Sequence, residues 1–419
     1  MIGIVGAGIT GLALAHELAK RRVDCVVLEA APEPGGVIQT KEVEGHLLET
    51  GPQRVRLTGH VRALVAELGL EAEVIQAPPG LPLYIYRNGQ LRPVPLSLRE
   101  LFRTPALSWR GRARVLLEPL TRRAKENETV GAFLSRKFGR EAYLHVLGPL
   151  YGGLYGSDPD EMFVRHSLAE RLREMGASRS LLAAFARHGR SPRAGAPACT
   201  FRRGMRTLID ALYRLHAQRV ALNAPVHNIR RAPRGYLLET GNGSLQVDAV
   251  VLTVPADAAA RLLRELAPDA ATRLCRLTYN HVAVVHLYSA ARLEGFGYQV
   301  SFAERLRTRG VTWNASLFGR EGVYTAFLGG ARDASVADQP DVLLAAIAAA
   351  EFDLVTGYEA RALHVARTRL PAWDRSWVAL ERLELPPGVH LAANYESRIG
   401  IPGRLARARE LAERLAAAA

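Results

Sequence analysis

The sequence predicts a fold of mixed class, α/β and α+β: a Rossmann-like nucleotide-binding domain, a second domain built on a mixed sheet, and a helical insert. Two observations predict it. The chain opens with a strand, a glycine-rich turn, a helix and a second strand, the order that builds a parallel sheet around a nucleotide site. Strand-like segments then return only after a long helical region, which places a second sheet later in the chain.

The opening unit reads "IGIVGAGITGLALAHELAKRRVDCVVLEA", and its glycines predict a bound dinucleotide. The run Ile2–Val5 is typical of a buried parallel strand. Three glycines form G-x-G-x-x-G at the start of the helix: Gly6, Gly8 and Gly11. They allow a tight turn, close approach of the backbone to a pyrophosphate, and close packing of helix on strand. The second strand ends at Glu29, where a carboxylate can bind the adenosine ribose.

The segments after Glu29 favour FAD over a nicotinamide cofactor. "AAPEPGGVIQT" carries the pair Gly35 and Gly36, and "HLLETGPQRVRLTG" follows with Gly51 and Pro52. A nicotinamide enzyme does not need a second glycine-rich approach directly after the acid. An extended flavin does, because several backbone segments contact its pyrophosphate and ring. We therefore predict FAD.

Composition sets limits on the class of protein. The chain has 419 residues and three cysteines without a C-x-x-C pair, so we expect a reducing compartment, the cytoplasm. No histidine pattern indicates a metal site, no signal peptide is recognised, and no run of roughly 18 apolar residues could span a bilayer. The net charge of +14 points to an acidic partner, but no nucleic-acid motif accompanies it.

The densest basic region is 87–125, with nine arginines and one lysine against Glu100 and Glu118. Leucines, Phe102 and Trp109 are interleaved with these charges. This composition is typical of a helix that lies in a membrane interface. A solvated basic face on a helical insert explains it equally well, so the pattern leaves both interpretations open.

The rest of the chain predicts the layout. Residues 87–197 are mostly helical in pattern, with interrupting prolines. The segments 220–222, 236–239 and 247–253 are expected to form an antiparallel set, the last delivering Thr253 to the cofactor. "HVAVVHLYSA" and "GVYTAFLGGAR" predict strands of a second sheet, and a final helix is expected over 405–419.

Several longer stretches resemble one family over nearly the whole chain. "LLETGPQRVRLTGHVRALVAELGLEAEVI", "LGPLYGGLYGSDPDEM", "TFRRGMRTLIDAL" and "GFGYQVSFAE" are similar to the flavin-dependent protoporphyrinogen and coproporphyrinogen oxidases of haem biosynthesis. These belong to the FAD-dependent amine oxidase-like superfamily. Amine oxidases and desaturases share the nucleotide fold but lack "GGLYGSDPDEM".

The resemblance implies an FAD-dependent, oxygen-linked, six-electron oxidation of protoporphyrinogen IX to protoporphyrin IX, with peroxide as the reduced product. Conversion of coproporphyrinogen III to coproporphyrin III is the alternative. An amine oxidase or desaturase, or a flavoprotein that binds porphyrin without turnover, are rivals from other classes. The chemistry takes place at flavin N5, so no catalytic side chain is expected. The resemblance also implies peripheral association with the cytoplasmic membrane and leaves the oligomeric state open. It implies three parts: an FAD-binding domain comprising 1–80, 198–260 and 386–419, a helical, basic, membrane-associated insert, 81–197, and a substrate-binding sheet domain, 261–385.

The resemblance and the motifs together give the candidate site residues. The cofactor is expected to contact Gly6, Gly8, Ile9, Thr10, Gly11, Glu29, Ala30, Gly35, Gly36, Val37, Gly51, Pro52, Gln53, Arg54, Val226, Thr253, Ile399, Gly400 and Ile401. The substrate is expected to contact Gly153, Phe296, Gln299 and Phe327. No metal site is expected.

This chain departs from its relatives at positions that bear on the substrate. Many relatives carry a propionate-binding arginine where Leu83 stands and a leucine where Gln299 stands. The missing anchor could be replaced by Arg54, Arg56, Arg87 or Arg320, and the sequence does not choose among them.

Overall fold

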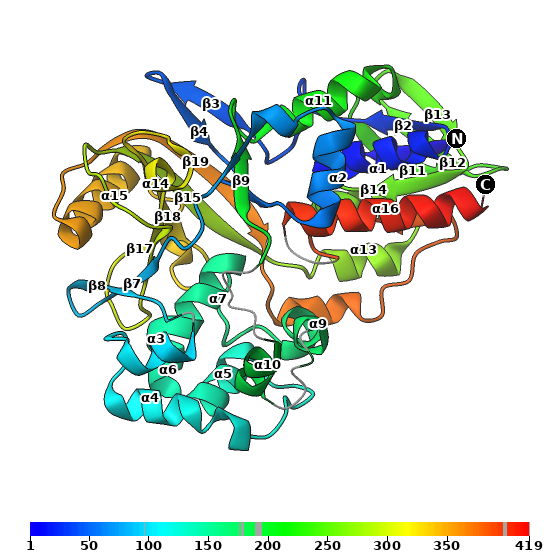
Figure 1. Ribbon diagram of the computed structural model, residues 1–419. Coiled ribbons are helices and arrows are strands. Elements are labelled where there is room, and N and C mark those ends of the chain that lie inside the picture. Colours follow the sequence, from blue (N-terminus) through cyan, green and yellow to red (C-terminus); the bar gives the residue numbers. More distant parts are fainter. Residues whose placement is uncertain (96, 175, 177–179, 189–194, 397–399, 419) are drawn as a thin grey trace.

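The computed structural model describes residues 1–95, 97–174, 176, 180–188, 195–396 and 400–418. Figure 1 shows three regions. The two chain ends lie in one α/β region, a large sheet with its covering helix lies beside it, and a group of helices lies below both.

The α/β region is built on a parallel sheet of five strands in the order β10-β2-β1-β14-β20. These are β1 (Ile2–Val5), β2 (Cys25–Leu28), β10 (Val220–Ala221), β14 (Ala249–Leu252) and β20 (Val389–Leu391). Three separate chain segments thus supply one sheet. Its strands are apolar and buried, as parallel strands covered on both faces must be.

Helices cover one face of this sheet and a small sheet covers the other. The helices are α1 (Ile9–Lys20), α2 (Gly59–Glu67), α11 (Arg206–His216) and α16 (Ile401–Ala418), and they share one apolar core. The opposite layer is β11 (Val226–Arg231), β12 (Tyr236–Thr240) and β13 (Gly243–Val247), all antiparallel. A Cβ atom at Gly3 would lie only 2.7 Å from Leu238 Cδ1, so this layer packs directly on β1.

The expected antiparallel set over 220–253 is wrong in two of its three strands. Only β12 lies in an antiparallel sheet, whereas β10 and β14 pair in parallel with β2 and β1. The segment Val250–Leu252 is a continuous apolar run buried on both faces, the pattern of a parallel strand. The turn at "TGNGS" joins β12 to β13, not to β14.

The second sheet has seven strands in the order β19-β15-β18-β17-β16-β7-β8. They are β7 (Leu83–Arg87), β8 (Gln90–Pro93), β15 (Tyr279–Tyr288), β16 (Gly297–Val300), β17 (Thr308–Trp313), β18 (Val323–Gly329) and β19 (Arg361–Pro371). Helix α15 (Asp341–Thr356) packs on one face and buries Leu344, Ala348 and Phe352. The predicted strands around "HVAVVHLYSA" and "GVYTAFLGGAR" are therefore present as β15 and β18.

The helical insert does not begin at residue 81, where the sequence predicts its boundary with the first FAD-binding segment. Strands β7 and β8 belong to the second sheet because β7 pairs in parallel with β16. Asn88 and Gly89, both with positive φ, form the tight turn between them, as an Asn-Gly hairpin turn requires. The helical part of the insert begins only at Leu98.

The helical region comprises α3 (Leu98–Arg103), α4 (Trp109–Leu116), α5 (Val130–Phe138), α6 (Arg140–Ala142), a π-helical turn (Tyr143–Leu147), α7 (Gly148–Tyr155), α8 (Val164–Ser167), α9 (Ala169–Glu174) and α10 (Leu181–His188). Helix α7 runs against the second sheet and contacts β16 and β17. Across the part of the chain that the structure describes, no helix has both the length and the apolar character needed to cross a bilayer.

The remaining elements connect these regions. They are the hairpin β3 (Thr40–Val43) and β4 (His46–Glu49), the small sheet of β5 (Val55–Arg56), β6 (Val74–Gln76) and β9 (Ala198–Phe201), and the helices α12 (Ala256–Leu263), α13 (Pro268–Leu274) and α14 (Asn314–Phe318). The segment that joins β4 to β5 lies against internal strands of the second sheet, since Thr325 on β18 donates to Gln53 Oε1 and His286 on β15 bonds to Glu49 O.

Candidate functional site: a nucleotide cradle that opens onto an arginine-bearing cavity

The turn from β1 into α1 can be built only with glycine at two places. Gly6 has φ +105°, a conformation that side chains rarely adopt, and a Cβ atom at Gly11 would lie 2.0 Å from Gly6 O. Gly8 differs, since its φ is −70° and nothing lies within 4 Å of its Cβ position. The backbone at Gly8 is therefore open on the side where Ile9 and Thr10 begin an α-helix that has no side-chain N-cap.

Glu29 is held at the end of β2, next to this turn. Its Oε2 accepts a hydrogen bond of 2.6 Å from Ala7 N, and its Oε1 accepts one of 2.9 Å from Ala31 N. Ala30 beside it is exposed. The carboxylate is thus fixed at the edge of the glycine turn, where the sequence places an adenosine ribose.

The second glycine pair packs against the first. Gly35 pairs with Gly8 in a parallel bridge, and Gly35 N donates to Ala7 O at 2.8 Å. A Cβ atom at Gly36 would lie 3.7 Å from Gly8 Cα. Gly51 is equally constrained, because its Cβ would lie 1.8 Å from Val37 O. Both glycine-rich segments therefore meet at one exposed stretch of backbone.

The remaining residues expected to contact the cofactor come from later segments of the chain. Thr253 Oγ1 lies within hydrogen-bonding distance of two carbonyl oxygens, 2.9 Å from Val5 O and 3.0 Å from Gly6 O. Its hydroxyl therefore stabilises the glycine turn. Val226 begins β11, opposite Thr240. Gly400 has φ +83° and precedes Ile401, the buried first residue of α16. Ile399 lies outside the described residues.

These features fit the diphosphate and ribose of FAD. An uncapped helix N-terminus favours negative charge, a glycine with an open Cβ position permits close approach, and a fixed carboxylate can accept ribose hydroxyls. The residues from Gly6 to Glu29 would hold the adenosine half. Gly51–Arg54, at the border of the second sheet, would lie toward the flavin ring.

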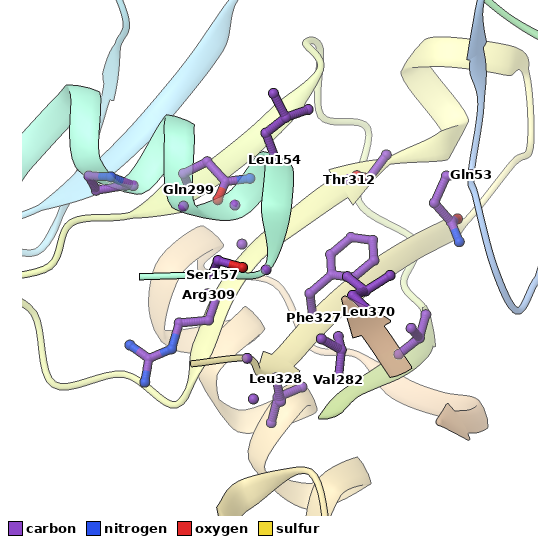
Figure 2. A pocket seen from close by; sticks show the side chains of 18 of the residues that line it. Gln53, Leu154, Ser157, Val282, Gln299, Arg309, Thr312, Phe327, Leu328 and Leu370 are labelled. Atoms are coloured by element: carbon purple, nitrogen blue, oxygen red, sulfur yellow. The ribbon is translucent and has the colours of Figure 1, made fainter. Parts of the chain in front are cut away.

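A cavity of about 520 Å³ lies where the α/β region, helix α7 and the second sheet meet (Figure 2). All four residues expected to contact the substrate line it: Gly153, Phe296, Gln299 and Phe327. Val37 and the whole segment Gly51–Arg54, expected to contact the cofactor, line it too. Predicted cofactor and substrate residues thus share one space, whose size is typical of ligand pockets.

Gln299 stands in the middle of this space because glycines flank its amide. A Cβ atom at Gly153 would lie 2.5 Å from Gln299 Oε1, and one at Gly310 would lie 2.8 Å from Gln299 Nε2. Any larger residue at either position would displace the amide. Val282, Val284 and Leu370 add apolar walls around it.

The structure separates the four arginines considered as substrate anchors. Arg87 donates to Glu141 at 3.1 Å and to Ala106 O, and Arg320 donates to Phe201 O and Arg202 O. Neither is among the residues that line the cavity, so neither is placed to anchor a ligand in it. Arg54 and Arg56 do line it, as does Leu83.

Arg54 is surrounded by protein and has little to neutralise it. Its Nη1 lies 3.4 Å from Thr312 Oγ1, and its guanidinium lies 5.6 Å from the centre of the Phe296 ring. Burial, with a smaller effect of the neighbouring Arg56, lowers the pKa of Arg54 to about 10. No carboxylate of the described residues lies within 4.0 Å of it. Arg54 is half-buried by solvent exposure, and a partly desolvated cation without a neutralising carboxylate favours an anionic ligand.

Sequence reasoning missed two further arginines, Arg309 and Arg332, which also line the cavity. Arg309 sits at a β-bulge, since Thr308 pairs with Leu328 and Gly310 with the next residue, Phe327. A bulge turns an extra side chain toward the face of its neighbour, which brings Arg309 to the same side as Gly310. No local sequence signal marks this bulge.

No acid, histidine, lysine, cysteine or tyrosine is among the residues that line the cavity. Nor do the described residues contain a group of three or more potential metal ligands.

A parallel nucleotide-binding sheet that meets a mixed sheet at a shared cavity is the arrangement of a flavin-dependent oxidoreductase. The chain belongs to the family "Flavin containing amine oxidoreductase", whose profile matches residues 9–403. This membership confirms the predicted fold class and the predicted FAD cofactor.

Comparison with known proteins shows which members of this family the chain is similar to. The chain is 30% identical over 352 residues to protoporphyrinogen oxidase 1 of Arabidopsis thaliana chloroplasts, a match over 75% of this chain and 66% of that protein. It is 26% identical over 377 residues to coproporphyrinogen III oxidase of Bacillus subtilis, over 81% and 79% of the two chains. The chain thus spans just under two thirds of the length of the plant relative.

One solved structure shows how completely the fold is shared. A protein from Exiguobacterium sp. 255-15, provisionally named a protoporphyrinogen oxidase, superposes with a TM-score of 0.84 at 22% identity, over 100% of this chain and 99% of that chain.

Proposed function

We propose that this protein oxidises a porphyrinogen to a porphyrin, with FAD as cofactor and molecular oxygen as final acceptor, in haem biosynthesis. The observation that carries the proposal is the single cavity shared by Gly51–Arg54 and by the predicted substrate residues. Such a shared cavity suits a porphyrinogen ring, which must lie beside the flavin to be oxidised. The relatives named above act on protoporphyrinogen and coproporphyrinogen, which support this substrate class.

The chain's own residues position the substrate and exclude water. FAD, when bound, would accept hydride from the substrate and pass the electrons on to oxygen. Phe327, Val284 and Leu370 form apolar walls for a flat ring. Gln299 Oε1, held between two glycines, can accept a hydrogen bond from a pyrrole N–H. Removal of six electrons and six protons consumes three oxygen molecules and yields three of hydrogen peroxide.

Anaerobic mixing with a porphyrinogen tests this proposal. We expect the visible absorbance of the bound flavin to bleach as porphyrin fluorescence rises, with about three flavins reduced per porphyrin formed, because each flavin accepts two of the six electrons. Porphyrin binding without bleaching would instead identify a carrier. Bleaching by an amine but not by porphyrinogen would identify an amine oxidase and overturn the proposal.

We further propose that the protein works in the cytoplasm, attached peripherally to an anionic membrane through the helical region. Trp109 at the start of α4 is 68% exposed and Leu120 is 77% exposed. Phe102 and Leu117 are exposed nearby, and Arg110 stacks on Trp109 at 5.3 Å. Exposed apolar side chains beside cations are the two features that interfacial binding requires.

Vesicle sedimentation tests this attachment. We expect the protein to bind anionic vesicles at low salt and to be released at high salt, since salt screens the attraction. Trp109→Ser combined with Leu120→Ser should abolish binding, whereas Val342→Ser, an exposed apolar residue on α15, should not. Arg112 and Arg114 are unsuitable for charge reversal because they donate to Phe102 O and to Arg136 O and Lys137 O. Equal binding to neutral vesicles, or none to either kind, would contradict the proposal.

A further inference from the structure

The cavity has an unusual charge for a slot that holds an apolar ring. Four arginines line it: Arg54, Arg56, Arg309 and Arg332. Their acidic neighbours, Asp158 and Asp333, do not line it, and neither does any other carboxylate of the described residues. The surface offered to a ligand is thus cationic as well as apolar.

The arginines stand at two separate ends. Arg54 contacts Thr312, near the last residues of β17, whereas Arg309 lies three residues earlier on that strand. Three residues of extended strand span about 10 Å. In Figure 2, Thr312 and Gln53 lie at one side of the cavity and Arg309 at the other. Between them lie Phe327 and Val282.

Each end has its own electrostatic environment. Arg56 is the cation that acts on Arg54, while Arg332 and Asp333 act on Arg309. Burial lowers the pKa of Arg309; Asp333 opposes this and Arg332 adds to it. The two arginines therefore have different charged neighbours and stand as two charged sites at opposite ends of the cavity.

Arg309 keeps hydrogen-bonding capacity for a ligand. Its Nη2 lies 3.4 Å from Asp333 Oδ2, but Arg307 already holds both oxygens of that carboxylate, at 2.6 and 3.2 Å. The Nε of Arg309 is buried and has no hydrogen-bond partner. At the opposite end Arg54 has only the long contact to Thr312. A carboxylate reaching either end would gain charge-assisted bonds.

We propose that the cavity selects a porphyrinogen with carboxylates on opposite edges of the ring, Arg54 binding one edge and Arg309 the other. This inference rests on the proposed function, and it distinguishes between the two candidate substrates, coproporphyrinogen III and protoporphyrinogen IX. Coproporphyrinogen III carries a propionate on each of its four pyrroles. Protoporphyrinogen IX carries two, on neighbouring pyrroles, and would place a vinyl-bearing edge against one of the guanidinium groups. The two-ended charge therefore favours coproporphyrinogen III.

Porphyrin binding to the FAD-loaded protein tests the inference without turnover. Coproporphyrin III and deuteroporphyrin IX, which has two neighbouring propionates, are titrated by fluorescence quenching. We expect coproporphyrin III to bind at least about tenfold more tightly, because one additional charge-assisted bond of this kind has that effect. The two-propionate porphyrin should use the Arg54 end, because Arg54 has no carboxylate neighbour whereas Arg309 faces Asp333. Arg309→Met should therefore remove the preference by weakening coproporphyrin III alone, and Arg54→Met should weaken both porphyrins.

Two further variants make the result decisive. Arg309→Lys keeps the charge but not the forked donor geometry, so an intermediate preference is expected. Arg234→Met removes an exposed arginine far from the cavity and should change nothing. Equal binding of the two porphyrins by the unaltered protein, or an equal loss for both in Arg309→Met, would overturn the inference and leave the proposed function standing. Failure of any porphyrin to bind would overturn both.

Discussion

Replacing Gly8 by alanine is expected to yield a folded protein that binds FAD more weakly than the parent. Gly8 has φ −70° and no atom within 4 Å of its Cβ position, so a methyl group strains neither the backbone nor the packing of the protein itself. It does occupy the open side of the turn, where a pyrophosphate must approach the N-terminus of α1. We expect affinity to fall by about 1–3 kcal/mol, the usual cost of one methyl group too many.

The comparison with Gly11→Ala and Gly59→Ala isolates this effect. A Cβ at Gly11 would lie 2.0 Å from Gly6 O, so that variant should lose thermal stability even without cofactor. Gly59, at the start of α2, also has nothing within 4 Å of its Cβ position and is exposed, so its variant should match the parent. Melting curves of the cofactor-free proteins and FAD titrations separate the three. Full FAD affinity in Gly8→Ala would show that the pyrophosphate does not lie against this turn.

The sequence alone was sufficient to predict the nucleotide end because its determinants are local. The spacing of Gly6, Gly8 and Gly11 requires a particular turn, and the acid at Glu29 follows one strand later. The structure adds the reason that Gly35 and Gly51 are glycines: Gly35 has φ +113°, and a side chain at Gly51 would overlap Val37 O. Neither constraint follows from the spacing of residues, because each depends on how the chain after Glu29 folds.

Strand pairing could not be predicted in the same way. The segment around Val251 was assigned to an antiparallel set from its neighbours in sequence, yet it pairs with β1, about 250 residues away. Apolar runs identify buried strands but not their partners. The same limit placed β7 in the helical insert, although it pairs with β16.

The substrate end was only partly visible in the sequence. Gly153, Phe296, Gln299 and Phe327 came from the resemblance, and all four line the cavity. Arg309 could not be predicted in this way, because the direction of its side chain depends on a bulge that is defined by the pairing of β17 with β18. The choice among anchoring arginines likewise required knowing that Arg87 pairs with Glu141.

Replacing Lys137 by methionine is expected to destabilise the helical region by about 3–5 kcal/mol, since it leaves an unpaired carboxylate in the interior. Lys137 Nζ lies 2.9 Å from Glu118 Oε1, and the two side chains are only 2% and 0% exposed. Glu118 also accepts hydrogen bonds from Ser180 Oγ and Leu181 N. This single carboxylate therefore ties together α5, the turn after α4 and the start of α10.

The double variant Glu118→Gln with Lys137→Met should recover most of the loss, because the amide can still bond to Ser180 without leaving a buried charge. Arg361→Met breaks an exposed pair with Glu44, in which both side chains are 54% exposed, and should have little effect because solvent screens such pairs. Urea unfolding of the FAD-saturated proteins, followed by circular dichroism, measures the differences. If Lys137→Met were as stable as Arg361→Met, water would have to reach Glu118, and the pair could not be what holds the helical region together beside the cavity.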